Sequence, residues 1–392
     1  MIDDTPITPI TFAGLGVSSD LVDALAAAGI DEPFPIQALT IPDAMAGRDV
    51  CGKAKTGSGK TLAFGIPMLE RLGRAGRGAP TGLVLVPTRE LATQVSEVLQ
   101  PLGKVRNVRV EPVYGGVAMD PQVDALRAGT ELVVGTPGRL IDLMDRGELQ
   151  LDALQVMVLD EADRMLDMGF MPQVQKILYR AKGEYQTMLF SATLDGAINW
   201  LVRRLRDPAR HEIMSRDVTV DEMEHRFLLV HEMDKVRVAA AITRGVERTL
   251  MFCRTKIGAD RVARDLEREG VDCAAIHGDR RQNVREKALS DFAAGKLPVL
   301  VATDVAARGL DVEGVDVVVH YDPPDDHKSY LHRSGRTARA GKSGVAVTLM
   351  LWNEENLVRQ LQRRIGVQDP IVEVFSNDPR LTDLTDWDPV DA

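Results

Sequence analysis

The chain has 392 residues, a length typical of two or three domains. Hydrophobic residues make up 44% of it and charged residues 27%, the proportions of an ordinary globular protein. The formal net charge of −10 excludes a protein that binds nucleic acid by bulk positive charge, but it leaves room for a local basic groove.

Half of the net negative charge lies in the last twenty residues, 373–392, which hold six acidic side chains and one basic side chain. This segment has little apolar content, so we predict a disordered acidic tail. A solvated end without function is the simplest interpretation of the tail. Recruitment of the chain by a protein partner is the alternative.

The three cysteines, Cys51, Cys253 and Cys273, are far apart and form no C-x-x-C pair. A disulfide framework or a cysteine zinc site is therefore not expected. We expect the protein to work in a reducing compartment. The first residues lack the basic region of a signal peptide, and no apolar run approaches the roughly 18 residues of a membrane span. We expect a cytoplasmic protein.

Short apolar runs rich in β-branched residues alternate with amphipathic stretches along the chain. Continuous apolar strands separated by helices predict mostly parallel sheets with helices on both faces, which is an α/β fold. The polar, acidic stretch 215–224 is the predicted linker between domains 1–214 and 225–372. The predicted strands are 83–86, 108–113, 132–134, 156–159 and 188–190 in the first domain, and 227–230, 250–252, 299–301, 315–319 and 345–349 in the second.

Residues 54–61 match the phosphate-binding loop G-x-x-x-x-G-K-[ST], except that Ala54 replaces the first glycine. Gly57 and Gly59 allow backbone N–H groups to turn toward phosphates, and the following helix offers its positive N-terminal end. Lys60 can then reach the β- and γ-phosphates, and the Thr61 hydroxyl can bind Mg²⁺. The alternative is an ordinary glycine-rich turn before a helix, which the Gly-Lys-Thr spacing disfavours.

The apolar run 156–159 leads directly into the acidic sequence 160–163. Asp160, at the carboxyl end of that predicted strand, is placed to bind Mg²⁺, and Glu161 can act on an attacking water as general base. A helix start enriched in acids to complement its dipole is the alternative. Together the two elements indicate a Mg²⁺-dependent ATPase or GTPase, a description that small-molecule kinases also satisfy.

Residues 160–163 read Asp-Glu-Ala-Asp, and over about residues 12–365 the chain resembles the DEAD-box RNA helicases of helicase superfamily 2. The motifs occur in family order: 87–91, 115–116, 136–139, 160–163 and 191–193, then 252–255, Gln282 with Arg285, 302–311 and 332–339. The resemblance implies two tandem RecA-like domains. It also implies an RNA-dependent ATPase that uses ATP and Mg²⁺ to unwind short RNA duplexes locally or to remodel RNA–protein complexes.

The resemblance, together with the residue patterns, assigns roles along the chain. The catalytic residues are Lys60, Glu161, Arg336 and Arg339, the two arginines acting as fingers that complete the ATP site. The nucleotide-binding residues are Phe12, Gln37, Ala54, Thr56, Gly57, Ser58, Gly59, Lys60, Thr61, Asp160, Gly309 and Asp311, with Thr61 and Asp160 as metal ligands. The residues that couple ATP to strand separation are Asp163, Ser191, Thr193 and His332, although His332 can equally be a structural hydrogen bonder.

By the same resemblance, the RNA-binding residues are Pro87, Thr88, Arg89, Gly116, Thr136, Pro137, Gly138, Arg139, Thr255, Arg285, Thr303 and Asp304. Hydroxyls, glycine and proline turns and arginines contact phosphate and sugar rather than base edges, so little sequence specificity is expected. Aromatic residues are only 4% of the chain, which argues against a base-stacking platform.

The chain departs from the family in the adenine-reading motif. Gln37 is present to read the adenine edge, but Ile30 stands where the family has an aromatic residue, and Phe34 stands where it has Ser or Thr. These changes predict weaker ATP affinity, with adenine selection resting mainly on Gln37. Ser334 and Ala338 also differ from the common Ile and Gly of the last motif. An ATP-dependent RNA clamp and a DNA helicase of the same superfamily are the alternative functions.

Overall fold

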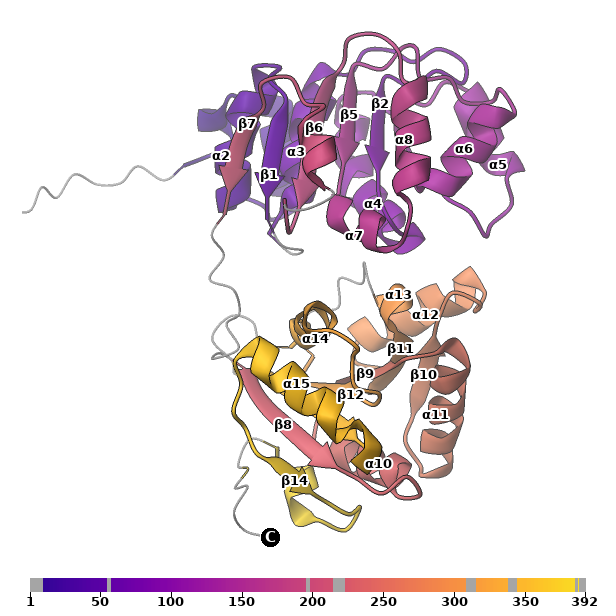
Figure 1. Cartoon of the computed structure of the whole chain (residues 1–392). Helices are drawn as coiled ribbons and strands as arrows, with labels where there is room; N and C mark the ends of the chain where they lie inside the picture. The colour runs from indigo at the N-terminus through magenta and orange to yellow at the C-terminus, as the bar shows by residue number, and fades with distance from the viewer. Residues whose placement is uncertain are drawn as a thin grey trace, which may run out of the picture. The chain divides into compact units, whose positions relative to one another are not determined.

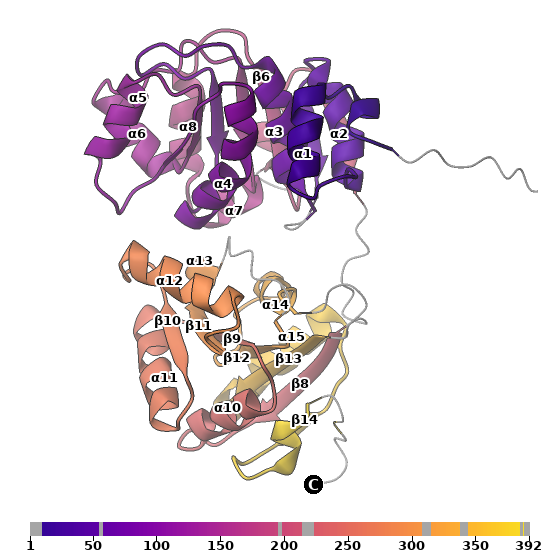
Figure 2. The same cartoon turned by 180° about the vertical axis from the view of Figure 1, so that it is seen from behind.

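The computed structural model describes residues 10–54, 58–194, 198–213, 223–307, 315–337, 344–384 and 387, except the side chains of residues 305, 307 and 328. Its contacts divide the chain into two compact units, Met1–Ser215 and Arg216–Ala392 (Figures 1 and 2). Each unit is built on a seven-stranded sheet in which every recorded strand pair is parallel. The predicted α/β fold with two parallel sheets is confirmed.

The first sheet has the strand order β3-β4-β2-β5-β6-β1-β7. Its strands are β1 Val50–Lys53, β2 Gly82–Leu85, β3 Val110–Val113, β4 Leu132–Gly135, β5 Val156–Leu159, β6 Gln186–Ser191 and β7 Ala209–Glu212. The helices of this unit are the short η1 Ala13–Leu15, then α1 Ser19–Ala27, α2 Pro35–Met45, α3 Lys60–Arg71, α4 Arg89–Val105, α5 Asp120–Arg127, α6 Pro137–Asp145, α7 Ala162–Asp167, α8 Met171–Arg180 and α9 Asn199–Val202.

Strand β5 shows why the sequence folds into a layered unit. Val156 and Val158 are buried in the core shared with α1–α4, whereas Met157 and Leu159 are buried in the core shared with α5–α9. Successive side chains of a strand point to opposite faces, so a strand covered on both faces must be apolar throughout. Figure 1 shows α8 in front of this sheet, and Figure 2 shows α1 and α4 on its other face.

The second sheet has the order β10-β11-β9-β12-β13-β8-β14, which repeats the order of the first sheet strand for strand. Its strands are β8 Met223–Leu229, β9 Thr249–Cys253, β10 Cys273–Ile276, β11 Val299–Thr303, β12 Val317–His320, β13 Gly344–Met350 and β14 Ile371–Glu373. The helices are α10 Lys235–Arg244, α11 Lys256–Arg268, α12 Gln282–Ala293, α13 Asp304–Ala307, α14 His327–Ser334, η4 Trp352–Glu354, α15 Glu355–Ile365 and η5 Pro379–Thr382.

Four strands, β1, β7, β10 and β14, were absent from the sequence prediction. Each is short, and their compositions (Val-Cys-Gly-Lys, Ala-Arg-His-Glu, Cys-Ala-Ala-Ile and Ile-Val-Glu) lack a run of three large apolar residues. Strand β7 and strand β14 lie at sheet edges, where polar side chains are tolerated. The predicted linker 215–224 lies mostly outside the described residues, and its last two residues begin β8.

The described part of the predicted disordered tail is packed against the second unit, and in this part the sequence prediction is wrong. Strand β14 pairs with β8, and Leu381 and Leu384 are buried in the core beneath α10. Trp387 packs under two guanidinium groups, with Arg380 at 5.0 Å and Arg226 at 5.9 Å from the ring centroid. The three apolar residues recur every third position, so a mostly acidic segment still presents one apolar side.

We predict that Leu381→Ala lowers the free energy of unfolding of the second unit by about 2–5 kcal/mol, because it leaves a cavity in a core where Leu381 is fully buried. Phe375→Ala is the matched control from the same segment, since that ring is 53% exposed. Denaturation of the full chain measures both effects. Equal stabilities of the two variants would contradict the packing described for the segment.

Candidate active site and nucleic-acid interface

The phosphate-binding loop joins the end of β1 to the start of α3, and Gly59 is its last residue before the helix. Gly59 has a φ of 83°, and a Cβ there would lie 2.5 Å from both the Gln37 amide nitrogen and the Phe34 ring. Only glycine therefore fits this position. Of the predicted loop residues, Ser58 is half-buried beside Gly59, whereas Thr56 and Gly57 lie outside the described residues.

The Gln37 side chain ties the start of α2 to this loop. Its Nε2 donates to the Gly59 carbonyl at 2.9 Å, and its Oε1 accepts from the Phe34 N–H at 2.8 Å. Both ends of the amide are thus engaged with backbone, and the residue is buried. The amide nitrogen has a second hydrogen and the amide oxygen a second lone pair, and these are the positions left for a ligand such as adenine.

Two of the residues in or near the adenine-reading motif serve the core. Phe12 is buried among the apolar residues of the first unit, so its ring packs inside the unit. Ile30 is partly buried against the same core. The Phe34 ring is mostly exposed and borders Gly59, at the position where the family has Ser or Thr. Contact with the loop is therefore apolar at this position.

Lys60 and Asp160 meet at the carboxyl edge of the first sheet. Lys60 is the first residue of α3 after β1, Asp160 follows β5, and β6 lies between these two strands. The Lys60 Nζ lies 3.8 Å from Asp160 Oδ1, and both side chains are more than nine-tenths buried. The Asp160 Oδ1 also accepts from the Glu161 N–H at 2.9 Å, and no bond to Oδ2 is recorded among the described residues.

Burial raises the pKa of Asp160 to about 6, and the charge of Lys60 opposes the rise. Removing a carboxylate from water disfavours its ionised form, so this group is destabilised at neutral pH. A cation bound beside Asp160 would relieve that cost. Thr61, the next residue of α3, adds a half-buried hydroxyl-bearing side chain near the same place.

Glu161 has an unusual backbone conformation, with φ 51° and ψ 49°. A non-glycine residue in this left-handed region costs roughly 1–2 kcal/mol, and such residues cluster at functional sites. The buried Glu161 carboxylate pairs with Arg164, one turn along α7, with 2.6 Å between Oε2 and Nη1. Sequence reasoning missed Arg164, although its spacing of three from Glu161 on a helix was a signal.

Hydrogen bonds join the Asp160–Asp163 segment to Ser191 and Ala192. The Asp163 N–H donates to Ser191 Oγ at 3.3 Å, and the Ala192 N–H donates to Asp163 Oδ2 at 3.2 Å. The Ser191 carbonyl accepts from the Ala54 N–H at 3.0 Å, so the same residue also touches the end of β1. Thr193 is exposed in the loop that follows.

The predicted RNA residues of the first unit follow three neighbouring strands, β3, β4 and β2. Arg89 begins α4 after Pro87 and the helix cap Thr88, whose hydroxyl accepts from the Leu91 N–H. The guanidinium of Arg89 lies so close to Gly116 that a Cβ there would overlap it. On α6, after Thr136, Pro137 and Gly138, Arg139 donates to the Val117 carbonyl at 3.0 Å.

Arg139 is nine-tenths buried, yet its Nε and Nη1 have no hydrogen-bond partner among the described residues. Burial lowers the pKa of its guanidinium; Asp142 opposes the shift, and Arg89 and Arg146 add to it. Unpaired buried donors are rare and call for an explanation. A phosphate oxygen supplies both the hydrogen-bond acceptor and the negative countercharge that the Arg139 guanidinium lacks.

The predicted RNA residues of the second unit follow β9, β10 and β11, which occupy the same sheet positions as β2, β3 and β4. Thr255 caps α11 and accepts from the Gly258 N–H at 2.9 Å, while Arg285 is buried on α12. Thr303 ends β11, and Asp304 is held by two hydrogen bonds of 2.6 and 2.7 Å from Arg333. Asp304 is therefore neutralised by an arginine that sequence reasoning left without a role.

Around α14, Arg336 is nine-tenths buried and His332 is exposed. Ser334, one of the departures from the family, is fully buried and bonds through Oγ to His320 Nε2 at 3.1 Å. A buried histidine therefore compensates for the polar side chain. Gly309, Asp311, Ala338 and Arg339 lie outside the described residues.

The second unit holds a counterpart of the Lys60–Asp160 pair. Lys235 is the first residue of α10 after β8, and Asp322 follows β12, so both stand where Lys60 and Asp160 stand in the first unit. Lys235 Nζ lies 3.9 Å from Asp322 Oδ1 and packs over the Tyr321 ring. The turn before Lys235 contains no glycine, so it cannot form a phosphate-binding loop.

A glycine loop after β1 and a buried carboxylate after β5 define a P-loop nucleoside triphosphatase, and the repeated sheet topology makes it one with two RecA-like domains. Residues 34–199 match the family model described as DEAD/DEAH box helicase, and residues 233–341 match that of the helicase conserved C-terminal domain. The chain belongs to the DEAD-box family of ATP-dependent RNA helicases, as its motifs indicated.

Curated relatives share most of the chain. It is 43% identical over 356 residues to the DEAD-box ATP-dependent RNA helicase CshA of Geobacillus kaustophilus, covering 90% of this chain and 76% of the relative. It is 41% identical over 357 residues to CshA of Bacillus subtilis, covering 90% of this chain and 72% of the relative.

Solved structures show the same fold. Dbp5 of S. cerevisiae bound to RNA and ADP BeF3 superposes with a TM-score of 0.81 at 30% identity, covering 94% of this chain and 96% of the neighbour. A DEAD box protein of Methanococcus jannaschii matches with a TM-score of 0.51 at 34% identity, covering 93% of this chain and 99% of the neighbour. In the part of the chain that the structure describes, no helix is long and apolar enough to cross a membrane.

We predict that Asp160→Asn stabilises the nucleotide-free protein at pH 7.5 and that the gain shrinks toward pH 4. The folded-state pKa lies above the ordinary value of 3.8, so the wild type loses stability as pH rises through about 6, and asparagine escapes that loss. The gain is at most about 3 kcal/mol. Denaturation at both pH values measures it, and a gain independent of pH would contradict the assignment.

We predict that Arg139→Met weakens binding of single-stranded RNA of any sequence by about tenfold or more while leaving the melting temperature unchanged or higher. The substitution removes a phosphate contact, and it also removes a buried charge that has unmet hydrogen bonds. Arg146→Met on the exposed end of α6 is the matched control. Fluorescence anisotropy and thermal denaturation test the two effects, and a destabilised variant with unchanged RNA affinity would reverse the interpretation.

Proposed function

We propose that the protein is an RNA-dependent ATPase that separates short RNA duplexes locally or remodels RNA–protein complexes, without long translocation. The observation that carries this proposal is the buried Lys60–Asp160 pair beside the phosphate-binding loop, in a chain whose motifs and relatives are those of DEAD-box helicases. The separate clusters that follow β3, β4 and β2, and β10, β11 and β9, give the nucleic acid a surface in each unit.

Mg²⁺ is the proposed metal, with Asp160 and Thr61 as its protein ligands. Carboxylate and hydroxyl oxygens are the hard donors that Mg²⁺ takes, and the raised pKa of Asp160 marks a carboxylate whose charge the protein neutralises incompletely. When bound, the metal supplies positive charge to the phosphate oxygens. Lys60 adds a second positive charge from the start of α3.

Glu161 is the proposed general base. Its strained backbone and its pair with Arg164 fix the carboxylate one residue beyond Asp160, where it can accept a proton from a water that attacks the γ-phosphate. Arg164 holds the carboxylate in place. Arg336 and Arg339 of the second unit are the proposed fingers that stabilise charge on the transferred phosphoryl group.

We propose that the protein contacts the RNA through the RNA's sugar–phosphate backbone. The contacting residues are Arg89, Gly116 and Arg139 in the first unit and Thr255 and Arg285 in the second. Arginines and helix starts recognise phosphate and carry no sequence information, so the specificity must come from elsewhere. We propose a protein partner that recruits the enzyme to its substrates. The three described cysteines are buried and unbridged, in keeping with work in the reducing cytoplasm.

The decisive measurement is ATP turnover by the full chain with and without single-stranded RNA at low salt, and we expect RNA to stimulate it. Strand displacement from a short RNA duplex should accompany turnover. Binding without displacement would make the protein an ATP-dependent RNA clamp, and equal stimulation by DNA would make it a DNA helicase. Turnover that is independent of any nucleic acid would refute the proposal.

We predict that Glu161→Gln retains ATP and RNA binding and lowers ATP turnover by roughly 100-fold or more, because it removes the proposed base and keeps the shape of the side chain. Glu148→Gln is the control, since Glu148 pairs with Arg127 elsewhere in the same unit. Nucleotide binding and turnover are measured on the same preparations. Normal turnover in the Glu161 variant would remove that residue from its proposed role.

A further inference from the structure

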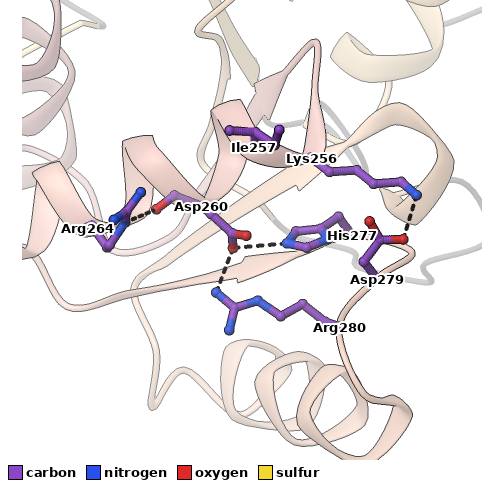
Figure 3. Close-up of a pocket in the computed structure, with 7 residues that line it drawn as sticks. All are labelled: Lys256, Ile257, Asp260, Arg264, His277, Asp279 and Arg280. Carbon is purple, nitrogen blue, oxygen red and sulfur yellow. Dashed lines mark hydrogen bonds and ion pairs between the residues drawn. The ribbon is translucent and has the colours of Figure 1, made fainter.

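A charged pocket opens on the second unit, between the first three turns of α11 and the turn that links β10 to α12 (Figure 3). Its volume is about 440 Å³. The pocket is lined by Lys256, Ile257, Asp260, Arg264, His277, Asp279 and Arg280. None of these residues belongs to the predicted ATP or RNA site.

The polar side chains of the pocket form two small networks. Asp260 Oδ1 accepts from His277 Nε2 at 2.9 Å and from Arg280 Nη2 at 2.6 Å (Figure 3). Lys256 Nζ donates to Asp279 Oδ1 at 2.7 Å. Arg280 and Lys256 are thus held at opposite parts of the lining, each by one carboxylate.

Positive charge exceeds negative charge in this region. Arg264 donates only to the Asp260 backbone carbonyl, and the exposed Arg281, next to the pocket, makes no ion pair among the described residues. In the lining itself, three cationic side chains stand beside two carboxylates, in a chain whose net charge is −10. The pocket therefore attracts anions locally, where the protein as a whole repels them.

The ion pairs of the pocket are of the kind that an incoming phosphate can displace. The side chains of Lys256 and Arg280 are 51% and 43% exposed, and pairs this exposed contribute roughly 0–1 kcal/mol. A phosphate offers more acceptor oxygens than the carboxylate it replaces, and an arginine can bind it through two N–H groups. Lys256 also stands in the first turn of the 13-residue helix α11, whose positive end favours anions.

His277 gives an independent sign that the lining is incomplete. The residue is only 4% exposed, and its Nδ1 has no hydrogen-bond partner among the described residues, although Nε2 is bonded to Asp260. Buried polar atoms are almost always paired, so this atom of a lining residue calls for a further polar partner such as a bridging water.

The position of the pocket identifies the source of the phosphate. Thr255, which caps α11, immediately precedes Lys256, and Arg281 immediately precedes α12, which carries Arg285. The pocket is therefore formed by the helix that Thr255 caps and by the turn that leads into the helix of Arg285. A strand that lies on Thr255 and Arg285 reaches the pocket without leaving this surface.

We propose that this pocket binds a backbone phosphate of the RNA strand, just beyond the nucleotides held by Thr255 and Arg285. Lys256 and Arg280 supply the charge, and His277 positions Arg280 through Asp260. The inference rests on the proposed function, because it extends the track of the same RNA. It gives an acidic chain a longer grip on RNA in the second unit.

The test is the double variant Lys256→Gln/Arg280→Gln, which removes both charges and keeps the lengths of the side chains similar. With a single strand of roughly 15 nucleotides we expect about tenfold weaker binding, and a slope of log K against log salt that is shallower by about 0.7, the value for one phosphate. With a strand of roughly 6 nucleotides, which ends before the pocket, we expect no change. Unchanged ATP turnover without RNA and an unchanged melting temperature verify folding.

Arg268→Gln is the matched control, because Arg268 lies on α11, is exposed, and pairs with Asp265 at 2.8 Å outside the pocket. A double variant that behaves like this control would overturn the inference while leaving the proposed function intact. A wild type that binds no RNA would overturn both. Inorganic phosphate that binds wild type but not the double variant, with RNA affinity unaffected, would assign the pocket to free phosphate instead.

Discussion

The burial of a lysine opposite a carboxylate at the carboxyl edge of a parallel sheet is the interaction on which the rest of the molecule depends. Lys60 and Asp160 lose their hydration in the folded chain. The attraction between the two charges at 3.8 Å does not fully offset the cost of that desolvation. A fold made only of parallel strands brings the ends of β1 and β5 to the same edge, with β6 between them. The helices on both faces supply the apolar burial that offsets this cost.

The recurrence of the pair as Lys235 and Asp322 shows what the glycines add. Both units place a lysine at the start of the helix after the sixth strand in the spatial order, and an acid after the fourth. In the first unit a glycine-rich sequence precedes the lysine. In the second unit the turn before the lysine has no glycine, so the pair only joins the strand ends. One topology thus carries a phosphate-binding loop motif in one unit and lacks it in the other.

The predicted roles of residues are related to strand position. In the first unit the predicted phosphate-handling residues Lys60 and Asp160 follow β1 and β5, and the predicted RNA residues follow the neighbouring strands β3, β4 and β2. Ser191 ends β6, between β5 and β1, and has hydrogen bonds with Asp163 and Ala54. In the second unit Arg333 of α14 holds Asp304, which follows β11, and Arg336 lies just beyond the end of the same helix.

The sequence allowed the strands with continuous runs of large apolar residues to be predicted, because burial on both faces demands apolar side chains throughout, and the ordered motifs located the loop and the acids. It did not reveal β10, where Ala and Cys fit a crowded interior without a strand-like pattern, or the partnership of Glu161 with Arg164. The sequence predicted that Gln37 contacts adenine. It did not predict the hydrogen bond from Gln37 to Gly59, because only the fold brings the start of α2 next to the phosphate-binding loop.

The docked C-terminal segment has a further consequence for the chain in solution. Strand β14 is the outermost strand of the second sheet, and it covers the backbone N–H and C=O groups along β8. An open strand edge with apolar residues such as Phe227 and Leu228 is a template for pairing with another chain. A protein shortened before residue 371 would expose that template, so β14 protects this edge of the sheet.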